Sequence, residues 1–301
     1  MNIETVRQGT AYEKYANPFA RDGVVHIPQA FSARDLALIQ AAYDWKLSNP
    51  GPGGQWLYPE SGAKFLQAGG YSVDQPDFVR VLRDTPAAEI ASALFGGGPV
   101  WFIGEQLFYK DGGSPTGRAR RTPWHQDSSY LPFNGSKIAV LWIALDDVPR
   151  ESALEVVRGS HLGVTYNASS FDDIDDTAPL YADSEMPRLP DIEADRSKWD
   201  IVGEAAQPGD VLVFHTAALH GGGATAPGRR RRSLTLRFIG DDVISVTRPA
   251  MRTDSQLAET LTRAREPGAE GVDALTAAYA KMEPGELLHR AGLAQVRPWS
   301  L

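Results

Sequence analysis

The chain has 301 residues and no cysteine, which excludes disulfides, thiolate nucleophiles, iron–sulfur clusters and cysteine-ligated zinc. Its 42% hydrophobic and 23% charged residues are the balance of a globular protein, and its net charge of -8 disfavours a nucleic-acid partner, which needs a broad basic surface. The longest strongly apolar run, residues 138–145, is far shorter than a membrane span, and residues 1–16 lack the apolar core of a signal peptide. We therefore expect a cytoplasmic protein with no membrane partner.

The N-terminal part of the chain predicts one strand followed by two helices. The apolar residues within 24–27 predict a short strand. Ser32 followed by Asp35 is a capping box, and the helically spaced apolar residues after it predict a helix over 33–48. A proline just inside its start and a glycine run just past its end predict a second helix within residues 85–98.

From residue 99 onward the pattern indicates an antiparallel β core. Strand-like segments, separated by turns rich in glycine, proline and aspartate, occupy residues 100–109, 137–144, 211–214 and 233–238. Several short strands of this kind indicate a sandwich or barrel. Residues 138–145 are apolar on both alternating faces, which predicts a strand buried between two layers. After residue 247 the pattern is helical again, with candidate helices at 255–265 and 272–281.

These elements predict a mainly β fold with flanking helices, in one domain over residues 1–301 with a core at about 99–245. Residues 165–200 interrupt that core. Within them, residues 171–200 contain ten acidic and three basic side chains, a net charge of -7, which leaves about -1 for the rest of the chain. Two interpretations of this acidic insertion are open: a lid over an active site, or a disordered surface loop.

A metal site is suggested by residues 124–127, which have the sequence WHQD. In a strand, side chains two residues apart point to the same face, so His125 and Asp127 would project an imidazole and a carboxylate to one side. These are two of the three ligands in the two-His-one-carboxylate triad of non-haem Fe(II) oxygenases. Taken alone, the pair is better explained as two polar residues at a strand end.

A third ligand is offered by the histidines near residue 220. His220 precedes three glycines, which let a backbone and a cofactor approach closely. His215 competes for the role, but strand parity places the two histidines on opposite faces. The glycines, and the interval of eleven residues between His220 and Arg231, favour His220. The guanidinium of Arg231 can form a forked hydrogen bond with a carboxylate, and Ser233 has the same parity and can add a hydroxyl.

Taken together and in this order, five pieces of the sequence resemble the phytanoyl-CoA dioxygenase-like (PhyH) family of Fe(II)/2-oxoglutarate-dependent oxygenases. The pieces are WHQDSSYLPF at 124–133, VLWIAL at 140–145, GSH at 159–161, PGDVLVFH with a following histidine at 208–220, and RRSLTLRF at 231–238. A weaker similarity extends to the segment at 19–32.

The resemblance implies a double-stranded β-helix, the open jelly roll of the cupin type. It implies Fe(II) held by His125, Asp127 and His220. It also implies that 2-oxoglutarate, the co-substrate used together with O2, chelates the iron through its C1 carboxylate and keto oxygen. The distal carboxylate of 2-oxoglutarate would then meet Arg231, helped by Ser233.

The same resemblance implies a hydroxylase for a small organic metabolite, with release of succinate and CO2. Trp142 and Gln106 stand where family members contact the co-substrate. Related halogenases have a small residue in place of the carboxylate ligand, so Asp127 favours hydroxylation over halogenation.

Three further residues are candidates for substrate contacts. Tyr130 and Phe133 either line the substrate pocket or pack in the core. Arg237 shares the parity of Arg231, and it either pairs with a substrate anion or forms a structural salt bridge. Glu155 departs from the family, in which this position is more often apolar.

The other histidines, His26, His161 and His289, are expected to be structural. The arginine run at 229–232 is expected to contain one functional arginine with solvated neighbours, rather than a nucleic-acid site.

Three functions are open from the sequence. The first is an Fe(II)/2-oxoglutarate oxygenase acting on a small molecule, and the second is a cupin-like metal enzyme that does not use 2-oxoglutarate and does not require Arg231. The third is a non-catalytic ligand-binding protein on the same fold, which the complete triad disfavours. The sequence does not specify an oligomeric state.

Overall fold

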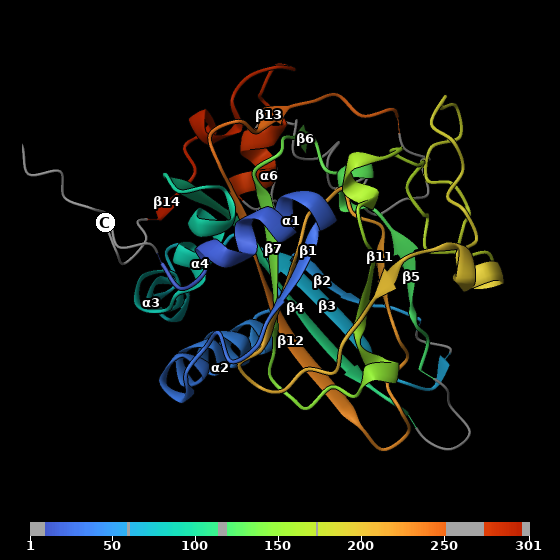
Figure 1. Ribbon diagram of the computed structural model, residues 1–301, viewed down its shortest axis with the longest axis horizontal. Coiled ribbons are helices and arrows are strands. Elements are labelled where there is room, and N and C mark those ends of the chain that lie inside the picture. The colour runs from blue at the N-terminus through green and yellow to red at the C-terminus, as the bar shows by residue number, and fades with distance from the viewer. Residues whose placement is uncertain (1–9, 59–60, 114–118, 173, 251–273, 297–301) are drawn as a thin grey trace, which may run out of the picture.

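The computed structural model describes residues 10–58, 61–113, 119–172, 174–250 and 274–296. Two antiparallel sheets face each other and form the jelly roll. The larger sheet has the order β1-β10-β7-β12-β4-β3-β2, with β14 also paired to β4, and the smaller has the order β5-β11-β8-β9. Figure 1 shows β5 and β11 on one side of the larger sheet and the helices α2, α3 and α4 on the other. This arrangement confirms the expected double-stranded β-helix.

The elements have the following bounds. The larger sheet consists of β1 (Val24–Ile27), β2 (Gly53–Trp56), β3 (Phe65–Gly70), β4 (Val100–Asp111), β7 (Ile138–Ala144), β10 (Val211–Phe214), β12 (Arg230–Ile239) and β14 (Gln295–Val296). The smaller sheet consists of β5 (Thr122–His125), β8 (Leu154–Val157), β9 (Ile201–Val202) and β11 (His220–Gly222), and a separate pair joins β6 (Phe133–Asn134) to β13 (Ile244–Ser245). The α-helices are α1 (Ala16–Asp22), α2 (Ala33–Ser48), α3 (Pro76–Asp84), α4 (Ala87–Leu94) and α6 (Ala274–Tyr279), and short 3-10 turns include η3 (Asp127–Ser129), η4 (Arg150–Ser152) and η6 (Glu193–Lys198).

The predicted strands and helices of the described region are confirmed, with shifts of a few residues at their ends. The candidate helix at 255–265 lies outside the described residues. Several elements have no counterpart among the predicted ones, including α1, β8, β9, the β2–β3 hairpin, whose strands are rich in glycine, and α3, which follows Gln75. The side chain of Gln75 caps α3 by accepting from the backbone N–H groups of Asp77 and Phe78.

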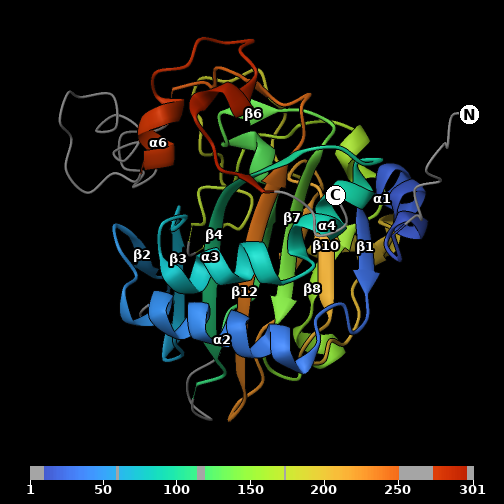
Figure 2. The same cartoon turned by 90° about the vertical axis from the view of Figure 1, so that its left-hand side faces the viewer.

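Strand β7 lies between two apolar layers, as its sequence predicts. Leu141 and Ile143 point outward into the main hydrophobic cluster, and Val140 and Trp142 point into the space between the sheets. The outer cluster is closed by α2, α3 and α4, and Figure 2 shows α2 and α3 crossing the outer face of the larger sheet. The helices therefore bury the outer face, and the inner face carries a smaller apolar cluster together with polar side chains.

None of the helices in the described part of the chain has the length and apolar character that crossing a membrane requires.

The capping box predicted for α2 is present. The Ser32 hydroxyl accepts from the Asp35 backbone N–H at 3.2 Å, and the Asp35 carboxylate accepts from the Ser32 backbone N–H at 2.9 Å. These bonds satisfy backbone donors that the first turn of a helix leaves unpaired. They therefore fix the start of the helix that covers the sheet.

We expect Ser32→Ala to lower the free energy of unfolding by about 1 kcal/mol, the usual cost of losing such a cap. Urea denaturation measures the change. Ser48→Ala is the matched control, because Ser48 lies at the other end of α2 and its hydroxyl donates to the Asp44 carbonyl of its own helix. Equal losses in the two variants would contradict this role of Ser32.

Candidate metal centre and its surroundings

Three potential metal ligands converge between the two sheets. His125 ends β5 and His220 begins β11, and the two residues face each other directly in the antiparallel register. Asp127 follows in η3, with its Oδ1 atom 3.6 Å from His125 Nε2 and 3.8 Å from His220 Nε2. All three residues are buried, and their ligand atoms lie within 4.8 Å of one another. The structure thus brings together the predicted triad.

The sequence pattern predicted that His125 and Asp127 project from the same strand, and this was wrong for Asp127. Asp127 does not continue the strand of His125; it is the first residue of a 3-10 turn. The turn is held by Gln126, whose amide group donates to the carbonyl of Ala217 at 2.7 Å and to that of Val164 at 3.1 Å. Because Gln126 itself is extended, the carboxylate still reaches the side of the imidazole.

Both histidines are oriented for ligation by backbone carbonyls. His125 Nδ1 bonds to the Pro123 carbonyl at 2.8 Å and His220 Nδ1 to the Ala218 carbonyl at 2.9 Å, which leaves each Nε2 atom directed toward Asp127. A bond of this kind fixes the tautomer whose Nε2 lone pair can bind a metal. Burial lowers the pKa of His125, and burial together with the neighbouring His125 lowers the pKa of His220 to about 3. Both side chains are therefore neutral, as metal ligands must be.

The carboxylate of Asp127 has two neighbours that stabilise its ionised form. Tyr130 donates its hydroxyl hydrogen bond to Oδ1, and Arg237 Nη2 lies 3.5 Å from Oδ2. Burial opposes ionisation, but the surrounding groups, including the Arg237 guanidinium and the Tyr130 hydrogen bond, outweigh it and lower the pKa of Asp127 to about 2. Burial, followed by Asp127, raises the pKa of Tyr130, so this phenol remains a donor.

Beyond Arg237, a row of amide side chains crosses the inner face of the larger sheet. Arg237 Nη2 donates to Gln106 Oε1 at 2.6 Å, and Gln106 Nε2 donates to Gln67 Oε1 at 3.2 Å. The structure therefore places Tyr130 and Arg237 beside Asp127, and Gln106 next to Arg237. Their roles toward substrate and co-substrate stay predictions.

From Arg231 to Thr235 every second residue of β12 is buried and polar, and this row continues to Arg237, next to the triad. Arg231 and Ser233 are 6% and 1% exposed, and Trp142 lies directly across from Thr235 in the neighbouring strand. Within the described part of the chain, Arg231 Nε, Ser233 Oγ and Thr235 Oγ1 have no hydrogen-bond partner. Thr235 was absent from the predicted site, although it has the parity of the predicted Arg231, Ser233 and Arg237.

These groups fit the iron and 2-oxoglutarate implied by the sequence. Two imidazoles and one carboxylate are a ligand set suited to Fe(II) that leaves open positions for an oxo acid and O2. Buried polar atoms are almost always hydrogen-bonded in folded proteins. The unpartnered atoms between Asp127 Oδ2 and Arg231 therefore mark where a polar ligand with a distal carboxylate would bind.

The acidic insertion at 165–200 packs against the metal centre. The ring of Phe171 meets the ring of His125 edge-on, with 5.1 Å between centroids. Tyr181 is buried, and its hydroxyl donates to the Ser129 carbonyl in η3 at 2.9 Å. These are contacts that a lid would make, and the lid role itself stays a prediction.

An ion-pair network joins this insertion to the smaller sheet and explains the unusual Glu155. Arg196 of η6 donates to Glu155 at 2.6 Å, and Arg121 donates to the same carboxylate at 3.4 Å. Glu193, also in η6, accepts from Trp124 Nε1 at 2.8 Å and pairs with Arg121. The acidic residue at 155 thus binds two arginines that an apolar residue could not.

Phe133 is placed in a hydrophobic cluster. Its side chain is 1% exposed and packs with Ile138, Val243 and Leu288, and its ring centroid is 5.7 Å from that of Tyr279. The contacts of Phe133 are therefore those of a core residue, the second of the two interpretations given above, and not those of a pocket wall.

His215 lies apart from the triad. Its Nε2 bonds to the Gly135 carbonyl at 3.1 Å, its Nδ1 accepts from the Ala217 N–H at 3.0 Å, and its ring is 5.5 Å from that of His161. Burial, followed by His161, lowers the pKa of His215 to about 4.

The remaining histidines have local partners. His26 pairs with Glu204 at 2.8 Å, and His289 stacks on Trp101 with 4.4 Å between ring centroids.

A jelly roll with a buried two-His-one-carboxylate triad is the architecture of a non-haem iron oxygenase. The sequence comparison narrows this class. Residues 19–233 match the family described as phytanoyl-CoA dioxygenase (PhyH), and the chain belongs to this family of 2-oxoglutarate-dependent iron enzymes.

The chain is also similar to individual proteins. A probable phytanoyl-CoA dioxygenase of Caenorhabditis elegans is 26% identical over 143 residues, which are 47% of this chain and 43% of that protein. The match thus spans less than half of this curated relative.

Solved structures show the same fold at low identity. The epimerase SnoN, in complex with Fe3+, alpha ketoglutarate and nogalamycin RO, has a TM-score of 0.65 and 19% identity over 95% of this chain and 99% of its own. The carbocyclase SnoK from nogalamycin biosynthesis has a TM-score of 0.59 and 20% identity over 83% of this chain and 97% of its own. EctD from S. alaskensis with bound Fe has a TM-score of 0.53 and 19% identity over 82% and 85% of the two chains.

We expect Tyr130→Phe to weaken Fe(II) binding by about 10-fold to 100-fold, because hydrogen bonds to a metal ligand orient it and tune its charge. Competition with a chelator in the absence of oxygen measures the affinity. Tyr181→Phe is the matched control, since it removes a buried hydroxyl bonded to a backbone carbonyl of the same turn. If both variants bind iron as the native chain does, Tyr130 does not support the ligand.

We expect His215 to make the fold less stable as the pH falls from about 6.5 to about 4. The unfolded chain protonates this histidine near pH 6.5 and the folded chain only near 4, so protons favour the unfolded state throughout that window. The full effect is about 3.5 kcal/mol, at about 1.4 kcal/mol for each of the 2.5 pKa units. Urea denaturation of His215→Gln should show a flatter pH dependence than the native chain, and an unchanged pH dependence would contradict this role of His215.

Proposed function

We propose that this chain is an Fe(II)- and 2-oxoglutarate-dependent oxygenase that hydroxylates a small organic metabolite and releases succinate and CO2. One observation carries the proposal. The buried triad of His125, Asp127 and His220 adjoins a line of buried polar atoms that lack protein partners among the described residues and end at Arg231.

The residues of the chain would divide the work as follows. The triad would hold Fe(II), which with 2-oxoglutarate bound supplies oxidising power from O2. The guanidinium of Arg231, with the hydroxyls of Ser233 and Thr235, would bind the distal end of 2-oxoglutarate by charge-assisted hydrogen bonds. Trp142 would form the wall beside it.

The surroundings of the triad support oxidation of a bound molecule. Tyr130 and Arg237 hold the carboxylate of Asp127, so its orientation does not depend on the metal alone. The acidic insertion lies against His125 through Phe171, and as a lid it would exclude water from the reacting atoms.

The alternative of a metal enzyme that does not use 2-oxoglutarate leaves Arg231 unexplained. Its side chain is buried, and among the described residues it has no carboxylate partner. A charge buried in this way is costly unless a ligand compensates it. A distal carboxylate is the compensation that the proposed co-substrate provides.

The proposal is tested by adding 2-oxoglutarate to the Fe(II)-loaded protein without oxygen and recording the visible spectrum. We expect a weak charge-transfer band from chelated co-substrate. His220→Ala should abolish it, and Arg231→Ala should raise the concentration of 2-oxoglutarate needed by about 100-fold, the scale for losing one partner of a buried charge pair.

Arg229→Ala is the matched control, because Arg229 belongs to the same arginine run but is exposed, and its spectrum should be unchanged. One bound iron per chain with no band at any 2-oxoglutarate concentration would reject the proposal in favour of the enzyme that does not use this co-substrate.

A further inference from the structure

The row of amide side chains beside the metal centre has a fixed direction. It continues past Gln67, whose Nε2 atom donates to Gln55 Oε1 at 3.3 Å, so it crosses from β12 to β2. A guanidinium can only donate hydrogen bonds, so Arg237 requires the oxygen of Gln106 to face it. The nitrogen of Gln106 must then face the oxygen of Gln67. Each amide of this row, made of Gln106, Gln67 and Gln55, therefore directs its nitrogen toward β2.

The amide row has hydrogen-bond donors that the protein does not use. An amide nitrogen carries two hydrogens. Gln106 and Gln67 each use one of them within the row, and Gln55 Nε2 donates to no protein group in the described part of the chain. All three residues are partly exposed. The row therefore presents accessible N–H groups, which suit a molecule with several acceptor oxygens.

Beside these amides the inner face of the sheet is bare at Gly69. This residue lies directly opposite Gln106 and so shares its face. Among the described atoms, a Cβ at Gly69 would meet only the Glu105 carbonyl oxygen, at 3.9 Å, and the backbone there is not left-handed. Gly53 differs, because a Cβ there would lie 2.5 Å from the Gly69 carbonyl oxygen. The fold thus does not itself require glycine at 69, and a glycine inside a strand often marks the close approach of a ligand.

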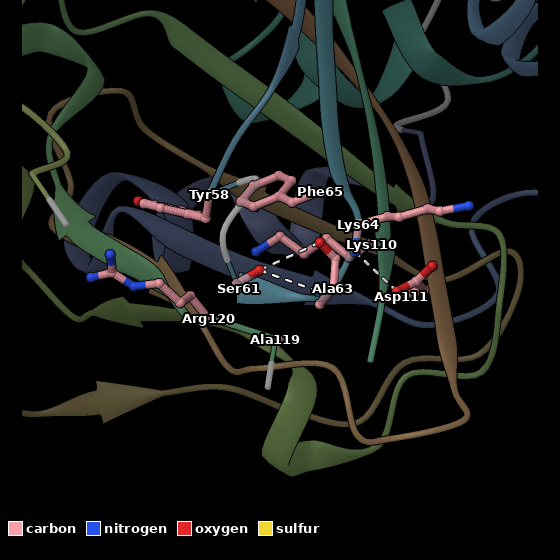
Figure 3. A pocket seen from close by; sticks show the side chains of 9 residues that line it. All are labelled: Tyr58, Ser61, Ala63, Lys64, Phe65, Lys110, Asp111, Ala119 and Arg120. Atoms are coloured by element: carbon pink, nitrogen blue, oxygen red, sulfur yellow. Dashed lines mark hydrogen bonds between the residues drawn. The ribbon is translucent and has the colours of Figure 1, made fainter. Parts of the chain in front are cut away.

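The other end of the same face is closed. Figure 3 shows Tyr58, Phe65 and Lys110 gathered there; the two ring centroids are 6.2 Å apart, and Lys110 Nζ lies 3.8 Å from the centre of the Phe65 ring. All three residues are buried. Phe108, by contrast, is partly exposed and lies directly opposite Gln67, so it adds an aromatic ring beside the amide row. The accessible part of the face is therefore the part that carries the amides and this ring.

The amide row also indicates the size and charge of a molecule that would lie along it. Neighbouring strands are about 4.8 Å apart, so the row spans about 10 Å from β4 to β2. Its amides are neutral and offer no charge to offset that of an ionised ligand. They pair instead with hydroxyl, ether and carbonyl oxygens, and the ring of Phe108 packs against an apolar ring.

We propose that Gln67, Gln55 and Gly69 belong to the substrate site, and that the substrate is a neutral ring compound with several hydroxyl, ether or carbonyl oxygens along about 10 Å. This inference rests on the proposed function. The row begins at Arg237, which lies beside the carboxylate of Asp127, so a molecule bound along the row has one end next to the metal centre.

The test measures binding by calorimetry, without oxygen, to the protein loaded with Fe(II) and 2-oxoglutarate. The neutral probes are phenyl β-D-glucoside and phenyl β-D-galactoside, which carry several oxygens next to an aromatic ring. The charged probe is phenyl β-D-glucuronide, which has the same frame with a carboxylate. We expect the native chain to bind a neutral probe at least about tenfold more tightly than the charged one, because the row cannot compensate the charge.

Two variants test the residues themselves. Gly69→Val fills the bare position with a side chain suited to a strand, so the stability should be retained while binding of the neutral probes falls at least about tenfold. Gln55→Glu keeps an oxygen toward Gln67 but has no hydrogen to donate, and it should weaken the same probes about tenfold. Gln207→Glu is the matched control, because Gln207 is exposed and lies outside the row. All of these variants should bind 2-oxoglutarate as the native chain does.

Four results would overturn the inference while the proposed function stands: no binding of either neutral probe by the native chain, tighter binding of the glucuronide, unchanged probe binding in both variants, or equal weakening of probe and 2-oxoglutarate. If the native chain binds iron but no 2-oxoglutarate, the proposed function fails and this inference with it. Should Gly69→Val not fold, Gly69→Ala is the smaller change with the same expected direction, and Gln55→Glu tests the row independently.

Discussion

The pairing of β5 with β11 is the constraint on which the site depends. This pairing sets His125 directly opposite His220, so backbone hydrogen bonds fix the separation of the two imidazoles. Asp127 then completes the triad from a turn that the side chain of Gln126 holds in place. Three ligands on a sheet and its adjoining turn form a preorganised site, because the folding free energy has already fixed their positions.

The two faces of the larger sheet have different roles: the outer face packs in the hydrophobic core, and the inner face carries the polar side chains of the site. Its outer face is covered by α2, α3 and α4 and forms the main hydrophobic cluster. Its inner face carries the polar side chains of β4 and β12 that surround the triad. Strand β7 contributes to both layers, which is why its sequence is apolar throughout. Charged and amide groups can thus be buried on one face because the other face supplies the hydrophobic free energy.

The sequence predicted what depends on local pattern. Apolar strands, the capping box at Ser32 and the ordered motifs around His125 and His220 were sufficient for the fold and for the triad. What it did not reveal depends on contacts between distant segments. Gln67 resembles any strand glutamine until β3 is aligned with β4 and β2, and Glu155 makes sense only once Arg196 reaches it from the acidic insertion. Asp127 was placed correctly for a partly incorrect reason, because a 3-10 turn leaves no signature in a two-residue spacing.

The register of β12 has a consequence for molecular length. The strand is paired with β4 from Arg230 to Ile239 on one side and with β7 from Ser233 to Ile239 on the other, so it cannot slide to fit a longer or shorter molecule. Its inward side chains are spaced by about 6.6 Å, two residues of a strand, whereas one carbon–carbon bond adds about 1.5 Å. The inward side chains of β12 therefore lie at fixed positions between the triad and Arg231, and their spacing is several times the length of one carbon–carbon bond. Under the proposed function, this fixed spacing would set the distance between the iron and the distal carboxylate, and a diacid one carbon too long would not fit both ends of the site at once.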